Sequence, residues 1–170
     1  MIRRVLMLMA LSLAAPSAAS AATITLDAGV LKFTATAGKT NNITLSQSAG
    51  NVTITRQPMA EDNDVFTLGG PCSATNDVAT CAGPITRIEV DVRDGSDRVT
   101  AITTGPPPPA PPPPIVTIPM TVGAGDGNDA VDTGFGNDTI DGGVGDDDID
   151  AGPGTTCCVA VKATTRSSPT

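Results

Sequence analysis

The sequence predicts an all-β protein in two parts, a small strand-rich region followed on its C-terminal side by short strands joined at glycine-rich turns. Two observations carry this prediction. Between residues 23 and 104, apolar and polar residues alternate in short runs, and no stretch shows the 3.6-residue period of an amphipathic helix. Between residues 124 and 150, a nine-residue phrase occurs three times in succession.

The chain begins with the features of a Sec-type signal peptide. A basic stretch at residues 1–4 precedes an apolar run at residues 5–15 and an Ala-x-Ala sequence at residues 19–21. The run is shorter than the roughly 20 residues that span a bilayer, so we expect no transmembrane anchor. We predict that residues 1–21 are removed and that the protein is secreted into an extracellular environment.

Residues 22–104 are expected to form a β-rich domain, because their apolar residues alternate with polar ones. The alternating residues are Leu31, Phe33, Ala35, Ile43, Leu45, Val52, Ile54, Ile88, Val90 and Val92. Cys72 and Cys81 bracket a small loop, and we expect them to form a disulfide in an exported protein. The region is either a separate sandwich or a set of coils that leads into the repeats.

A proline-rich segment at residues 105–119 is expected to act as a spacer. Eight of the nine residues from 106 to 114 are prolines, which favour an extended polyproline II conformation. Asp97 lies in a partial copy of the later phrase, but its distance from Asp129 along the chain is not a multiple of nine. The prolines therefore indicate an insertion, after which the coil resumes or a second domain begins.

The repeated phrase places the same residue types at the same positions. Asp129, Asp138 and Asp147 are nine residues apart, and each has a glycine two residues before it and Val or Ile two residues after it. Glycine permits the positive φ of a tight corner whose carbonyls and carboxylate offer oxygen ligands. The aliphatic residue begins a short strand and points into the core.

The three copies resemble the glycine-rich nonapeptide of the hemolysin-type (RTX) calcium-binding proteins, Gly-Gly-x-Gly-x-Asp-x-U-x, with U a large aliphatic residue. The copy at 142–150 matches every position, and the copies at 124–132 and 133–141 lack only the first glycine. Over residues 120–154 the resemblance implies a short parallel β-roll that binds Ca²⁺. It assigns nine residues to the metal sites: Gly125, Gly127, Asp129, Gly134, Gly136, Asp138, Gly143, Gly145 and Asp147.

Successive corners of such a roll lie on alternate edges, so the resemblance pairs corners two repeats apart. It implies that Asp129 and Asp147 share one ion, with glycine carbonyls completing a shell of about six to eight oxygens. Asp138 would need a partner at position 156, where the chain has Thr156, so that site is expected to be incomplete.

An EF-hand is a poorer match to this part of the chain. Asp146, Asp148 and Asp150 fit the opening of its loop, but Ala151 and Cys157 stand where it requires glycine and glutamate.

Composition favours cations as partners and argues against nucleic acid. The net charge is −8, and nine of the 18 acidic residues are aspartates between positions 121 and 150, where there is no Lys or Arg. The chain has no histidine, so it lacks the residue on which Ser-His and Cys-His catalytic pairs depend. We therefore predict that the protein is not an enzyme.

The repeat pattern ends after Gly154, and residues 155–170 are expected to be an irregular tail. Reading the codons of this tail one base earlier permits Asp at positions 156 and 165, Leu at 158, and Gly at 160, 161 and 163, in phase with the repeats. We predict a frameshifted repeat, which gene sequencing tests; an intact frame with unrelated codons contradicts it.

Together these features predict a secreted calcium-binding protein whose repeats fold when the ion binds. Two alternatives stay open. The chain is an adhesin-like protein that interacts with a partner on the cell surface or in the extracellular matrix, or it is a truncated remnant of a larger secreted RTX protein.

Overall fold

The computed structural model of the chain describes residues 21–57, 65–102, 115–155 and 157–160. These residues form fourteen strands and no helix, which confirms the all-β prediction. Accordingly, the described residues contain no helix with the length and apolar character needed to cross a membrane. The predicted signal peptide lies outside the described residues except for Ala21, where the first strand begins.

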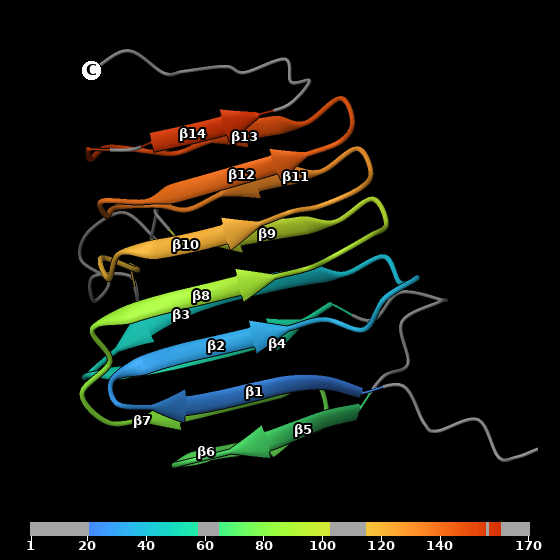
Figure 1. Ribbon diagram of the computed structural model, residues 1–170. Coiled ribbons are helices and arrows are strands. Elements are labelled where there is room, and N and C mark those ends of the chain that lie inside the picture. The colour runs from blue at the N-terminus through green and yellow to red at the C-terminus, as the bar shows by residue number, and fades with distance from the viewer. Residues whose placement is uncertain (1–20, 58–64, 103–114, 156, 161–170) are drawn as a thin grey trace, which may run out of the picture.

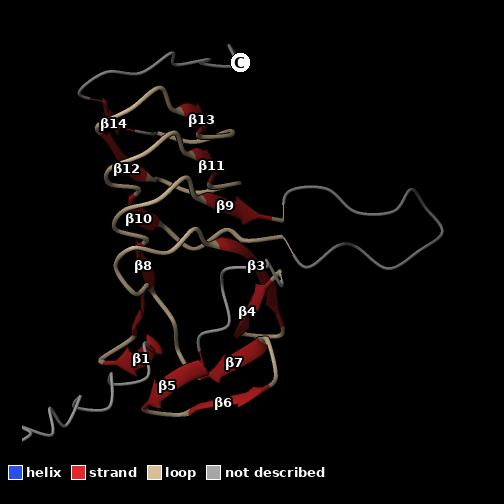
Figure 2. Cartoon of the chain, turned by 90° about the vertical axis from the view of Figure 1, so that its right-hand side faces the viewer, coloured by secondary structure: helices blue, strands red, loops and turns tan. Residues whose placement is uncertain are grey.

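The strands belong to two seven-stranded sheets that face each other across a common core (Figure 2). In chain order they are β1 (Ala21–Asp27), β2 (Val30–Thr34), β3 (Asn42–Ser48), β4 (Asn51–Arg56), β5 (Val65–Gly69), β6 (Cys72–Thr75), β7 (Val78–Ala82), β8 (Arg87–Asp91), β9 (Arg98–Ala101), β10 (Met120–Gly123), β11 (Ala130–Asp132), β12 (Thr139–Gly143), β13 (Asp148–Asp150) and β14 (Cys157–Ala160). The first sheet has the order β14-β12-β10-β8-β2-β1-β5, and the second has the order β13-β11-β9-β3-β4-β7-β6.

From β8 onward, successive strands alternate between the two sheets (Figure 1). Each strand therefore pairs in parallel with the strand two places further along the chain. Val122 of β10 lies opposite Ile140 of β12, and Val131 of β11 lies opposite Ile149 of β13. Both pairs are 18 residues apart, so two nine-residue phrases make one coil.

The N-terminal half contains antiparallel hairpins, and both sheets are mixed as a result. The strand pairs β1–β2, β3–β4 and β6–β7 are antiparallel. Two-residue turns join the first two pairs, and Ala28, Gly29, Ala49 and Gly50 all have positive φ, as a type I′ hairpin turn requires. β2 and β3 then pair in parallel with β8 and β9, so the hairpins continue directly into the coils.

Strands from both sides of the proline-rich segment share both sheets. β8 pairs with β10, and β9 pairs with β11. The carbonyl oxygen of Ile102 accepts a hydrogen bond from the backbone N–H of Val116 at 3.2 Å, so the chain leaves and re-enters the fold at one point. Residues 103–114, with their predicted polyproline conformation, lie outside the described residues. Of the two alternatives left open above, these registers support a coil that resumes after an insertion.

One hydrophobic core fills the space between the sheets. All ten residues of the alternating apolar pattern between Leu31 and Val92 are buried in it. Val116 and Ile118, from the end of the segment expected to be a spacer, are buried in the same core.

Two features of the cysteine-containing segments complete the fold. Cys72 and Cys81 lie opposite each other in β6 and β7 and form the predicted disulfide. At the other end of the molecule, four residues of the expected irregular tail form β14, in which Cys158 lies opposite Ile140 of β12.

Candidate metal centre

Three buried aspartates lie one above another at the same corner of successive coils, and we call Asp97, Asp129 and Asp147 the aspartate ladder. Each precedes the inward-facing Val or Ile of its strand by two residues, and residues i and i+2 of an extended chain point to the same side. The exposed fractions of the three residues are only 3%, 2% and 1%. The sequence pattern therefore turns each carboxylate inward together with a core residue.

Backbone hydrogen bonds connect the members of the ladder. Oδ1 of Asp129 accepts the N–H of Asp97 at 2.7 Å, and Oδ1 of Asp147 accepts the N–H of Asp129 at 3.0 Å. One coil earlier, Asn41 occupies the corresponding position. Its backbone N–H and its Nδ2 donate to Oδ1 of Asp97 at 2.6 Å and 3.1 Å. One oxygen of each ladder carboxylate is thus satisfied by the adjacent coil.

The second oxygen of each ladder carboxylate is buried and has no hydrogen-bond partner. This holds for Oδ2 of Asp97, Asp129 and Asp147 alike. Burying an anionic oxygen without a partner is unfavourable, so a repeated arrangement of this kind fits a cation. Among the described residues, no three acidic, His or Cys side chains converge on one point. A cation at the ladder would therefore also need backbone oxygens.

The corner glycines provide such oxygens, because they stack in columns that leave no room for side chains. A Cβ on Gly143 would collide with the carbonyl oxygen of Gly125, and a Cβ on Gly145 would collide with that of Gly127. Gly143 and Gly145 also have φ values of +77° and +153°, which L side chains rarely adopt. The backbones of neighbouring coils thus lie in close contact in the residues that precede the ladder aspartates, and the carbonyls there are hard oxygen donors of the kind that suits Ca²⁺.

Asp138 lies at the opposite edge, where the chain passes from the second sheet back to the first. Its Oδ1 accepts the N–H of Met120 at 2.8 Å, and its buried Oδ2 has no partner. Met120 occupies the ladder position one coil earlier, and Thr156, one coil later, lies outside the described residues. Gly134 and Gly136 stack against glycines of the next coil, as their counterparts do on the other edge. The structure therefore brings Asp129 and Asp147 together but places Asp138 with neither.

Burial makes the charged form of Asp97, Asp129 and Asp138 unfavourable. It raises the pKa of Asp97 to about 6, although hydrogen bonds from Asn41 lower it, and the charge of Asp129 adds to the rise. Burial also raises the pKa of Asp129 and the pKa of Asp138, in each case against a backbone hydrogen bond that lowers it. A divalent cation would remove this penalty by neutralising the carboxylates.

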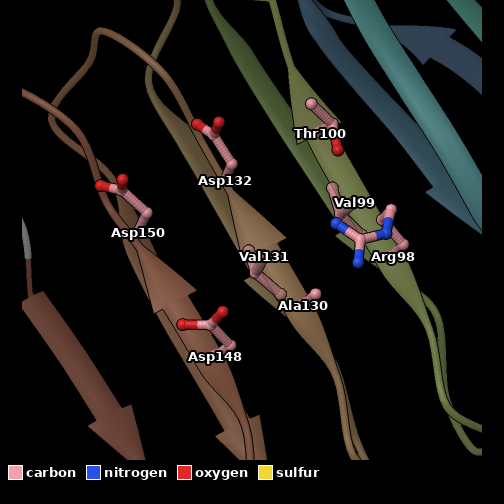
Figure 3. Close-up of a pocket in the computed structure, with 8 residues that line it drawn as sticks. All are labelled: Arg98, Val99, Thr100, Ala130, Val131, Asp132, Asp148 and Asp150. Atoms are coloured by element: carbon pink, nitrogen blue, oxygen red, sulfur yellow. The ribbon is translucent and has the colours of Figure 1, made fainter. Parts of the chain in front are cut away.

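A groove of about 360 Å³ lies on the outer face of β9, β11 and β13 and is lined by a second set of aspartates (Figure 3). Asp132 and Asp150 lie opposite each other in the parallel register, and their Oδ1 atoms accept the N–H of the glycine two residues later at 3.1 and 3.0 Å. Burial raises the pKa of Asp132, and the charge of Asp150 adds to the rise. Arg98 lines the same groove. These carboxylates close their own turns and lie on the opposite side of the strands from the ladder.

The sequence interpretation missed two residues of the corner. Asp97 was not assigned to the metal sites, because it lies out of phase with the nine-residue repeat. The available signal was the Gly-x-Asp-x-Val pattern that residues 95–99 share with the first full copy. Asn128 was also missed, and its Oδ1 accepts the N–H of Asp146 one coil later at 2.9 Å.

The case for a metal centre rests on the geometry of this chain. No protein-family model, no curated protein and no solved structure matches it.

Proposed function

We propose that this chain is a secreted calcium-binding protein in which Ca²⁺, held at the glycine–aspartate corners, stabilises a parallel β-roll of nonapeptide repeats. The observation that carries the proposal is the buried, unpaired Oδ2 of Asp129 and of Asp147, one coil apart. Carboxylate and carbonyl oxygens are the ligands that Ca²⁺ prefers. The parallel pairing of strands one coil apart and the resemblance to the hemolysin-type repeat support the same conclusion.

The ion is proposed to lie between the corners of Asp129 and Asp147. Its charge would neutralise both carboxylates and supply the partner that each Oδ2 lacks. The backbone donors assigned to it are the carbonyls of Gly125, Gly127, Gly143 and Gly145. Mg²⁺ demands a smaller, near-octahedral shell and gives up its waters reluctantly, so we expect it to bind far less well.

Binding is proposed to be coupled to folding. In the absence of cations, the ladder carboxylates are close together and out of water, which disfavours stacking of the coils. An ion that binds only the stacked state contributes its binding free energy to folding. Secretion, expected from residues 1–21, fits this role, and the Cys72–Cys81 disulfide suits an oxidising compartment.

Calorimetric titration combined with circular dichroism tests the proposal. We expect calcium on the order of 1 mM to raise the β content of the chain, and we expect Asp147→Asn to lose the ion held with Asp129. Asp148→Asn is the matched control, because Asp148 is the next residue, carries the same charge and is exposed on the outer face. Binding heat and dichroism that do not respond to calcium would contradict the proposed function.

A further inference from the structure

The aspartate ladder extends beyond the three nine-residue copies. Asp97 precedes Asp129 by 32 residues, whereas Asp129 precedes Asp147 by 18. The excess equals the separation along the chain of Ile102 and Val116, which are hydrogen bonded to each other. The coil of Asp97 therefore stacks directly on the coil of Asp129, although the insertion separates them along the chain.

The backbone around Asp97 repeats the arrangement found between Asp129 and Asp147. A Cβ on Gly125 would collide with the carbonyl oxygen of Arg93, and a Cβ on Gly127 would collide with that of Gly95. The backbone of Asp126 bridges the two corners, with its N–H donating to Arg93 and its carbonyl accepting from Gly95, both at 2.9 Å. The carbonyls of Arg93 and Gly95 therefore occupy the places that Gly125 and Gly127 occupy one coil later.

The side chain of Asp97 provides independent support for a ligand. Its exposed fraction is only 3%, and its Oδ2 has no partner. Both donors of Asn41 that reach Asp97 go to Oδ1, so they leave the second oxygen unsatisfied. Oδ2 of Asp129, the next aspartate of the ladder, is likewise buried without a hydrogen-bond partner. Asp94, the other acidic residue of the corner, uses its Oδ1 to accept the N–H of Gly38 at 2.7 Å.

We propose a further calcium site between Asp97 and Asp129, formed across the proline-rich insertion with the carbonyls of Arg93 and Gly95. The inference rests on the proposed function, because the site takes the same ion. Asp129 belongs to both pairs of the ladder, Asp97 with Asp129 and Asp129 with Asp147. Asn41 ends the series, since its neutral amide already donates to Asp97 and brings no charge for a further cation.

Such a site would join the two halves of the molecule. Asp97 lies between β8 and β9, directly after the half of the molecule that contains the hairpins. Asp129 lies in the first nine-residue copy. An ion between them would stabilise the contact between β9 and β11, which pair through only three residues of each strand.

Counting the ions bound per chain by calorimetry and equilibrium dialysis tests this site on the full chain. We expect Asp97→Asn to bind one calcium ion fewer than the unsubstituted chain while it retains the ion at Asp129 and Asp147. That retained ion also shows that the variant folds. Asp91→Asn, an exposed carboxylate at the end of β8, is the control and is expected to change nothing.

The outcomes separate the two claims. If the unsubstituted chain binds calcium and Asp147→Asn loses an ion while Asp97→Asn does not, the further site is overturned and the proposed function stands. If Asp97→Asn loses every ion, a separate site is likewise overturned. If the unsubstituted chain binds no calcium, both claims fall.

Discussion

The two carboxylate oxygens of each ladder aspartate have different functions, one in the fold and one in the proposed metal site. In each ladder aspartate, Oδ1 accepts a hydrogen bond from the adjacent coil, while Oδ2 is buried without a partner. An asparagine can replace the first function but not the second, because its remaining group is a neutral donor. Asn41 illustrates the difference at the N-terminal end of the ladder, where its amide donates to Asp97.

Gly127 is one of the corner glycines that we expect to be sensitive to substitution. Its φ is +147°, and a Cβ there would meet the carbonyl oxygen of Gly95. We expect Gly127→Ala to lower the free energy of unfolding by about 1–3 kcal/mol, measured by urea denaturation in calcium. Gly123→Ala is the matched control, because a Cβ on Gly123 would have no neighbour within 4 Å and its φ is not strained. Equal effects of the two substitutions would contradict the close stacking.

At the residue scale, the sequence predicted Asp129, Asp138 and Asp147 as corner residues, and all three are buried. It did not predict Asp97 or Asn41 as neighbours in the same column. Spacing along the chain equals spacing in the fold only where no insertion intervenes, and here one does. Their position depends on which coils stack, and this is a property of the whole fold.

Among the elements, the disulfide-bonded hairpin β6–β7 lies at one end of the second sheet, far along the sheet from the ladder strands. We expect replacement of Cys72 and Cys81 by Ser to lower the free energy of unfolding by about 2–3 kcal/mol, because the crosslink restricts the unfolded chain. Urea denaturation of both forms measures this change. The number of bound calcium ions is expected to stay the same, and a change in that number would show that the hairpin supports the metal corners directly.

The insertion offers a second test at the level of elements. Deleting residues 102–115 places Val116 directly after Ala101, so that Asp97 and Asp129 acquire the same spacing as Asp129 and Asp147. We expect this variant to keep its calcium binding and a melting temperature within about 5 °C of the full chain, because the cost of closing a loop depends weakly on its length.

A deletion that also removes Val116 is the control for this test. It takes one residue too many from the coil and one buried side chain from the core, so we expect it to be markedly less stable. Equal stability of the two deletions would contradict the proposed register.

The pattern of alternation predicted which side chains face the core but not which strands pair. A period of two assigns each residue to a face of a sheet and leaves the neighbouring strand open. Two-residue turns dictate the antiparallel hairpins locally, whereas the parallel pairs join strands that are separated by at least a whole coil. The mixed sheets were therefore out of reach of the sequence alone.

In the molecule as a whole, the buried aspartates oppose the stabilisation that the buried apolar side chains provide. The chain carries a net charge of −8, and its described part buries four aspartates, of which three form the ladder. Within the described ranges, the core contains only one fully buried aromatic side chain, Phe33. Modest apolar burial and unpaired carboxylates together make a metal-free fold that we expect to be only marginally stable.

Stability of the metal-free protein is expected to rise on acidification. The folded-state pKa of Asp97 is raised from 3.8 to about 6, so the folded chain holds this proton more tightly than the unfolded chain does. The resulting stabilisation is complete below the ordinary pKa and is lost as the pH rises through about 6. Urea denaturation in chelator should therefore give a free energy of unfolding that falls between pH 4 and pH 7.

Calcium is expected to reverse this trend, because protons and the ion compete for the same carboxylates. A profile in chelator that is flat or rises with pH would contradict the burial of an uncompensated carboxylate at Asp97.

The hydrogen bond between Ile102 and Val116 holds the two ends of the insertion together at one point of the fold. The length of the insertion therefore has little influence on the stacking of the coils before and after it. Related chains are thus expected to exchange or lose the insertion in one genetic event without a change in the stacking of the coils. A search for an unbroken nine-residue period would therefore divide one continuous fold into two unrelated parts.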